Sequence, residues 1–238
     1  LRDAARLWEH RPTAEQKVRV ETDRDLLRQT AASRRFGEVR LFRYAEQFSE
    51  TQQQQFSATA FLLDSDTVYV AFRGTDNTLT GWREDFNLSF LPYVPSQAAA
   101  AAYLRGILSL GFSNVYVGGH SKGGNLAAYA GMFVSDETRE YIQTVYNFDG
   151  PGFNEATISS PDFGKVDMRV RTFVPQCSMV GILMWLDYHG WVPTWLTKDD
   201  PYNSSVFISN LGSIKMHASY HHLTNWGTNS LFAIIDEK

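Results

Sequence analysis

The stretch Val115-Tyr116-Val117-Gly118-Gly119-His120-Ser121-Lys122-Gly123-Gly124-Asn125 decides which fold this sequence specifies. The apolar residues at its start predict a strand, and the small and apolar residues that follow it predict a helix. The pattern Gly-x-Ser-x-Gly lies between them, at a sharp strand-to-helix turn. In that context the serine is held exposed at the end of a sheet strand, as a nucleophile requires. We therefore predict that Ser121 is a nucleophile.

A nucleophilic serine also needs hydrogen-bond donors for the oxyanion that forms on its substrate. The N-terminus of the helix after Ser121 offers free N–H groups and a positive dipole end, which favours the Lys122 N–H as one donor. A second donor usually follows an earlier strand. Gly74 permits close backbone approach after the apolar run 68–72, so the N–H of Thr75, with its hydroxyl, is predicted as the other donor. The Lys122 side chain is expected on the surface or bonded to a loop.

Working outward from Ser121, the patterns of apolar and turn residues predict an α/β fold with a mostly parallel central sheet. A hairpin with its turn at 64–66 gives the sheet an antiparallel start. Ser96 is predicted to cap a helix, and 50–55 is expected to be a polar turn. The segment 185–205 has little periodicity, as is typical of a lid-like insertion. Strands are expected at 56–63, 67–72, 114–117, 144–148, 169–174 and 206–209, and helices at 23–32, 96–110 and 121–132.

Composition limits the function. The chain has 238 residues, of which 43% are hydrophobic and 20% charged, and this balance is typical of a single globular domain, here 1–238 with a helical N-terminal segment at about 1–35. A net charge of −4 argues against nucleic acid as a partner. The sequence contains no run of 18 apolar residues, so no membrane-spanning helix is predicted. Cys177 is the single cysteine, expected to be an inert core thiol. A cytoplasmic location is expected, with removal of a signal peptide as the alternative.

Several motifs resemble known lipases. Ala71–Thr75 and Gly81–Asp85 resemble the oxyanion segment of class 3 lipases, the fungal-type triacylglycerol lipases, and 119–125 resembles their nucleophile turn. The sequence is more similar to a bacterial family of lipase-like α/β-hydrolases that has no assigned substrate. That resemblance runs from about residue 25 to 226 and implies the α/β-hydrolase fold and hydrolase chemistry. Its motifs are at 33–36, 55–58, 72–76, 119–125 and 149–153.

The base of the triad is expected to be a histidine late in the chain. In this fold the triad order is serine, acid, histidine, which excludes His10 and His120. His120 is expected to pack or bond structurally. The segment from His221 to Trp226 resembles the base-bearing segment of several lipase-like families and favours His221, with His222 and His217 as alternatives. The histidines that satisfy the order are His189, His217, His221 and His222.

The acid is harder to predict than the base. Class 3 lipases carry it after the strand that corresponds to 169–174, but residues 175–178 contain no carboxylate here. Asp149 follows the preceding strand and is the predicted acid, which would orient the histidine and stabilise its charged form. The alternative is that Asp149 caps the turn at 150–152. Asp187 is the second candidate. Asp85 is expected to pair with Arg73 and brace the oxyanion loop.

These residues predict a serine hydrolase of the esterase or lipase type. Ser121 attacks an ester carbonyl, His221 accepts its proton, and the N–H groups of Lys122 and Thr75 bind the oxyanion. No cofactor or metal is expected. The expected substrate is a small ester, with an apolar acyl group that fits the aromatic residues of 185–202; ordinary core packing is the alternative reading of those aromatics. A non-catalytic scaffold, or a thioesterase or peptidase with the same site, stays open, as does the oligomeric state.

Overall fold

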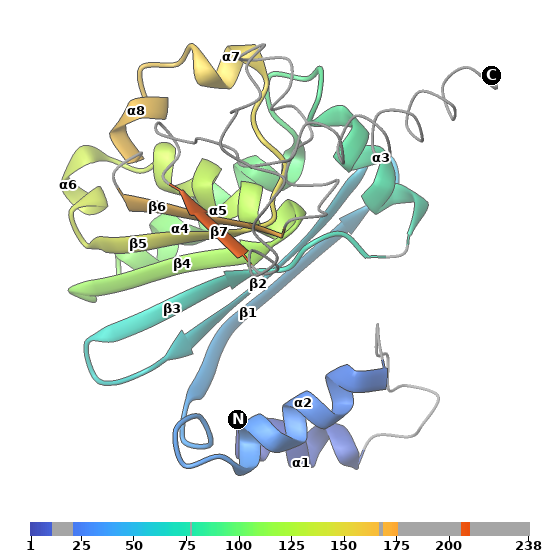
Figure 1. Cartoon of the computed structure of the whole chain (residues 1–238), viewed down its shortest axis with the longest axis vertical. Coiled ribbons are helices and arrows are strands. Elements are labelled where there is room, and N and C mark those ends of the chain that lie inside the picture. The colour runs from blue at the N-terminus through green and yellow to red at the C-terminus, as the bar shows by residue number, and fades with distance from the viewer. Residues whose placement is uncertain (11–20, 77, 167–168, 176–205, 210–238) are drawn as a thin grey trace, which may run out of the picture.

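The fold is built on a 7-stranded sheet with the strand order β1-β2-β3-β4-β5-β6-β7 (Figure 1). The computed structural model describes residues 1–10, 21–76, 78–166, 169–175 and 206–209. The strands are β1 (Arg40–Ser49), β2 (Gln54–Leu62), β3 (Thr67–Phe72), β4 (Asn114–His120), β5 (Ile142–Phe148), β6 (Val170–Pro175) and β7 (Val206–Ser209).

The pairing of the strands confirms the predicted α/β-hydrolase class. β1, β2 and β3 pair antiparallel, β3 to β6 pair parallel, and β7 is antiparallel to β6. The antiparallel start and the strand at 206–209 were both expected. β1 was not expected, because most of its side chains are exposed and the alternation of apolar and polar residues that reveals a strand is absent.

Two long helices cover one face of the sheet and build the core. The connections β3 to β4 and β4 to β5 step in the same direction across parallel strands, so right-handed crossovers place their helices on the same face. Val70 and Val117 point into this layer and are fully buried, as are Leu104 and Leu126 of the helices. The helices are α1 (Arg2–Glu9), α2 (Glu21–Ala32), α3 (Leu79–Asn87), α4 (Pro95–Leu108), α5 (Lys122–Met132), α6 (Asp136–Arg139), α7 (Glu155–Ile158) and α8 (Phe163–Val166).

Two local expectations were wrong. Val94, not Ser96, is the N-cap of α4, and Pro95 is its first residue. Ser96 is instead fully buried, with its hydroxyl donating to Glu84 Oε2 at 2.8 Å. The polar turn expected at 50–55 is shorter, because β2 begins at Gln54 and the side chains of Gln54 and Gln55 are both buried.

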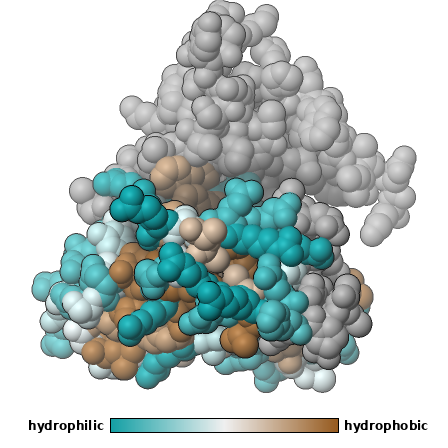
Figure 2. Space-filling view, turned by 90° about the horizontal axis from the view of Figure 1, so that it is seen from below, coloured by the Kyte–Doolittle hydropathy of each residue, from teal (hydrophilic) through white to brown (hydrophobic). Residues whose placement is uncertain are grey.

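The N-terminal helices lie at the start of β1 (Figure 1). The N-terminal amino group donates to Val39 O at 2.6 Å, and the Arg2 N–H donates to Gly37 O at 3.3 Å. The predicted helix at 23–32 lies within α2. Figure 2 views the molecule from this side, where hydrophilic side chains predominate and hydrophobic ones show between them. Across the part of the chain that the structure describes, no helix has the length and apolar character needed to cross a membrane.

Candidate active site

Ser121 occupies the turn between β4 and α5 in a backbone conformation that side-chain-bearing residues rarely adopt. Its φ is 56° and its ψ is −130°, in the region where φ is positive. The Ser121 N–H donates to Phe148 O of β5 at 2.9 Å, and the Ser121 carbonyl accepts from the Gly124 N–H at 2.8 Å. The predicted strand, turn and helix are therefore all present, with the serine at the point of strain between them.

The two glycines that flank Ser121 in the Gly-x-Ser-x-Gly pattern are required by space. A Cβ on Gly119 would lie 2.4 Å from the carbonyl carbon of Gly123. A Cβ on Gly123 would lie 2.3 Å from Phe72 O at the end of β3. Both contacts are with backbone, which cannot move aside as a flexible side chain can. The pattern thus lets the turn pack directly against the neighbouring strand.

The segment after β3 lies against this turn, as the sequence predicted. A Cβ on Gly74 would approach His120 O to 2.6 Å and Ser121 Cβ to 3.4 Å. The next residue, Thr75, is buried, and its hydroxyl donates to Asp85 Oδ2 at 2.6 Å. Within the described residues, neither the Thr75 N–H nor the Lys122 N–H has a hydrogen-bond acceptor. Among these residues both N–H groups therefore lack acceptors; one belongs to the residue after Ser121 and the other to the residue after Gly74.

The Lys122 side chain is not on the surface. It is 1% exposed, and its Nζ donates to Gln55 O at 2.8 Å, to Gln55 Oε1 at 2.9 Å and to Glu84 Oε2 at 2.9 Å. Glu84 is fully buried as well and also accepts from the Gln55 N–H and from the N–H and hydroxyl of Ser96. A buried ion pair is stable only when further hydrogen bonds satisfy both ions. These bonds do so, and they join the turn to α3, β2 and α4.

The expected pairing of Arg73 with Asp85 is wrong. Arg73 Nη2 lies 3.2 Å from Glu46 Oε1 instead, because the unexpected strand β1 brings that carboxylate alongside. Asp85 serves Thr75. Burial raises the pKa of the Asp85 carboxyl, while the bond from the Thr75 hydroxyl and the charge of Lys122 act in the opposite direction.

Asp149, the predicted acid, directly follows β5. It has a φ of 56°, is half-buried, and donates from its N–H to Phe173 O of β6 at 2.8 Å. It is adjacent to Phe148, whose carbonyl holds the Ser121 N–H. In the turn that follows, the Gly150 N–H donates to Asn147 Oδ1 at 2.9 Å. The acceptor for this N–H is therefore the side chain of Asn147.

The remaining predicted site residues lie outside the described residues. They include the histidine candidates and the second acid, and the expected insertion at 185–205 lies there too. His120 is described and is exposed, so of the two expected structural roles, packing or bonding, packing is wrong. The residues outside are Cys177, Asp187, His189, His217, His221 and His222.

Sequence reasoning missed the buried polar residues behind the turn. Gln55 and Glu84 lie within motifs shared with lipase-like families, and this was the one available signal. Asn125 Nδ2 donates to Pro151 O at 3.1 Å, and Asn125 Oδ1 accepts from Gln97 Nε2 at 2.8 Å. Isolated polar residue types give no indication of such partners, because the partners come from distant segments.

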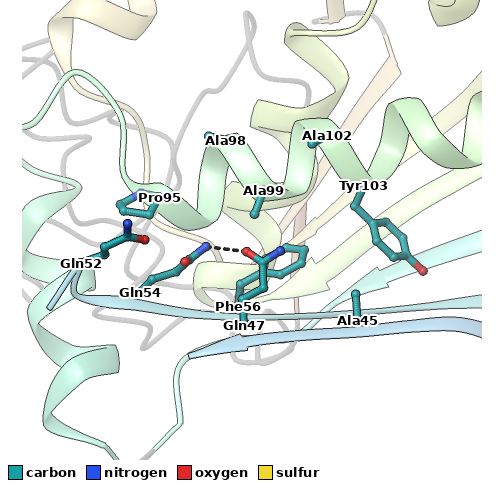
Figure 3. Close-up of a pocket in the computed structure, with 10 residues that line it drawn as sticks. All are labelled: Ala45, Gln47, Gln52, Gln54, Phe56, Pro95, Ala98, Ala99, Ala102 and Tyr103. Atoms are coloured by element: carbon teal, nitrogen blue, oxygen red, sulfur yellow. Dashed lines mark hydrogen bonds between the residues drawn. The ribbon is translucent and has the colours of Figure 1, made fainter. Parts of the chain in front are cut away.

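A separate cavity of about 420 Å³ lies between α4 and the strands β1 and β2 (Figure 3). Phe56 and Tyr103 contribute aromatic rings to its lining, and Gln54 Nε2 donates to Gln47 Oε1 at 2.9 Å on one side. Neither Ser121 nor Thr75 lines it. This cavity is therefore distinct from the candidate active site.

The sheet is mixed, with β3 to β6 parallel and the pairings at both edges antiparallel, so it is less parallel than the sequence predicted. Its parallel centre and the strained serine at a strand-to-helix turn define a protein of the α/β-hydrolase class. The chain belongs to the Mbeg1-like family, whose model matches residues 30–192. That family is lipase-like, which supports a hydrolase of this general kind. The expected relation to class 3 lipases stays a prediction.

One similar solved structure is a fungal lipase determined in complex with an inhibitor, in work that presents a model for interfacial activation. It is 16% identical to this chain, with a TM-score of 0.45. The match covers 63% of this chain, and the chain spans 63% of the length of that lipase. No curated protein sequence matched the chain.

Proposed function

We propose that this protein is a serine hydrolase that cleaves carboxylic esters through an acyl-enzyme on Ser121. The observation that carries the proposal is the strained conformation of Ser121, with φ of 56° beside two N–H groups that lack acceptors among the described residues. Such strain persists where the surrounding structure enforces it, and it clusters at functional sites. The two N–H groups supply the donors that acyl transfer needs.

The proposed reaction combines this geometry with the histidine that the sequence favours as the base. Ser121 Oγ attacks the ester carbonyl carbon while His221 accepts the hydroxyl proton, and the N–H groups of Thr75 and Lys122 bind the oxyanion. The bond to the alcohol then breaks, and the histidine protonates the leaving oxygen. Water attacks the resulting acyl-enzyme by the same route and releases the acid. Asp149 orients the histidine in this proposal.

An apolar surface beside the oxyanion loop supports a lipid-like acyl group. The helix α3 begins four residues after Thr75, and its outward face carries the exposed side chains of Leu79, Trp82 and Phe86. Phe90 continues this surface beyond the helix. Exposed apolar patches of this kind mark sites that contact lipids, ligands or proteins.

Ester hydrolysis tests the proposal. Wild-type protein and Ser121→Ala are compared on p-nitrophenyl esters from acetate to palmitate. We expect turnover by wild type alone, with the highest kcat/KM on longer chains. Equal rates for the two proteins on every ester would contradict the proposal and favour a non-catalytic scaffold.

The apolar surface has its own control. Phe86→Ala is expected to lower kcat/KM on long-chain esters several-fold while it leaves acetate almost unchanged. Leu7→Ala removes an equally exposed apolar side chain from α1 and is expected to change neither. Equal losses on short and long esters with Phe86→Ala would mean that this surface does not contact the acyl group.

A further inference from the structure

The side chain of Gln55 forms hydrogen bonds on both sides of Thr75, in the loop 73–76 that follows β3. Gln55 Nε2 donates to Gly74 O at 3.5 Å, and the Asp76 N–H donates to Gln55 Oε1 at 3.3 Å. Gln55 is 1% exposed and projects from β2, so its position is fixed by the sheet. One side-chain amide thus contacts the two peptide units that enclose this threonine.

The bond to Gly74 O also sets the direction of the Thr75 N–H. These two groups belong to the same peptide unit, and in a planar trans peptide the C=O and the N–H point in opposite directions. Holding the Gly74 carbonyl toward Gln55 therefore turns the Thr75 N–H away from Gln55. A Cβ on Gly74 would lie 3.4 Å from Ser121 Cβ, so this peptide unit lies beside the nucleophile turn.

The buried ion pair determines which way round the Gln55 amide lies. Lys122 Nζ donates to Gln55 Oε1 at 2.9 Å and to Gln55 O at 2.8 Å, and it is held in turn by Glu84 Oε2 at 2.9 Å. An ammonium group has only donors, so it must face the oxygen of the amide. The Nε2 of Gln55 is then left to face Gly74 O.

We propose that Gln55, fixed by the Lys122–Glu84 pair, is a positioning residue that aims the Thr75 N–H at the oxyanion. This inference rests on the proposed function. Lys122 contributes in two ways. Its backbone N–H is one oxyanion donor, and its side chain orients the other donor through Gln55. One buried network thereby connects the residues that carry the two donors.

Two substitutions at Gln55 test the proposal. Gln55→Glu keeps an acceptor for Lys122 and Asp76 but replaces the donor to Gly74 with a carboxylate oxygen. On p-nitrophenyl butyrate we expect kcat to fall roughly tenfold to hundredfold and KM to stay within about twofold, because a misdirected donor weakens transition-state binding more than substrate binding. Gln54→Glu is the matched control, since Gln54 is also buried but bonds to Gln47 instead of the loop. Its kcat is expected to stay within about twofold of wild type.

The second substitution has a readout that does not depend on activity. Gln55→Met keeps the length of the side chain but removes the acceptor for the Asp76 N–H, so the hydrogen exchange of this amide is expected to accelerate at least several-fold. Unchanged exchange at Asp76 would overturn the proposal, even if wild type hydrolysed no ester. Wild-type kcat in Gln55→Glu would overturn it as well. Equal rates for wild type and Ser121→Ala would instead refute the proposed function, and the exchange result would still decide on the role of Gln55.

Discussion

Replacing Ser121 with glycine is expected to leave the protein more stable than replacing it with alanine. Both substitutions remove the hydroxyl, so the comparison isolates the backbone. Alanine has a Cβ and must accept the same φ of 56° that the serine adopts. Glycine adopts positive φ at no steric cost.

The size of the effect follows from two opposing contributions. A residue with a Cβ in a sparsely populated backbone region costs about 1–3 kcal/mol. Glycine instead lowers the free energy of unfolding by about 0.4–1 kcal/mol relative to alanine, because the unfolded chain gains conformational freedom. The difference favours Ser121→Gly over Ser121→Ala by about 0.5–2 kcal/mol in the free energy of unfolding.

Urea unfolding of both variants measures this difference directly. Ser109 provides the control, because its φ is −67° in the ordinary helical region and its side chain is exposed. There the order is expected to reverse, with Ser109→Ala more stable than Ser109→Gly. If Ser121→Gly were no more stable than Ser121→Ala while the control behaved as expected, the turn at Ser121 would not be strained, and the main support for its role would be lost.

Three further outcomes are expected. Lys122→Met alone should lower the free energy of unfolding by about 3–5 kcal/mol, because it leaves the buried Glu84 carboxylate without its partner. Adding Glu84→Gln should recover part of this loss. A double variant no more stable than the single one would contradict the pairing. Gly123→Ala should cost about 1–3 kcal/mol or more in a thermal melt, whereas Gly164→Ala, with no atom within 4 Å of the new Cβ, should be tolerated. Burial raises the pKa of Asp85 in the folded state, so the unfolded chain releases this proton at lower pH than the folded protein. The free energy of unfolding should therefore fall as the pH rises above about 3.9 toward the folded pKa. Asp85→Asn should flatten this fall in urea unfolding measured across that pH window, and an unchanged slope would contradict a raised pKa at Asp85.

The elements nearest to Ser121 were predictable because their signals are local. An apolar run, a glycine-rich turn and a small-residue helix follow one another within 18 residues, from Val115 to Met132, and each constrains its own backbone. The hairpin of β2 and β3 has the same local character. Strand β1 gave no such signal, since its exposed side chains lack the alternation of a half-buried strand.

The support behind the site was not predictable for the opposite reason. Lys122 looks like a surface residue because lysine is rarely buried without a partner. Its partners Gln55 and Glu84 lie 67 and 38 positions away in the sequence. Only the folded sheet brings a strand, a helix and the turn together, so the burial of this lysine depends on tertiary structure. The same holds for Arg73, whose partner Glu46 comes from β1.

The most direct test of the central claim is the reaction of the folded protein with a fluorophosphonate, followed by peptide mass spectrometry. We predict one covalent adduct, located on Ser121, that is absent in Ser121→Ala and lost when wild type is unfolded in urea before exposure. A folded wild-type protein that carries no adduct on Ser121 under conditions that label a known serine hydrolase would contradict this prediction.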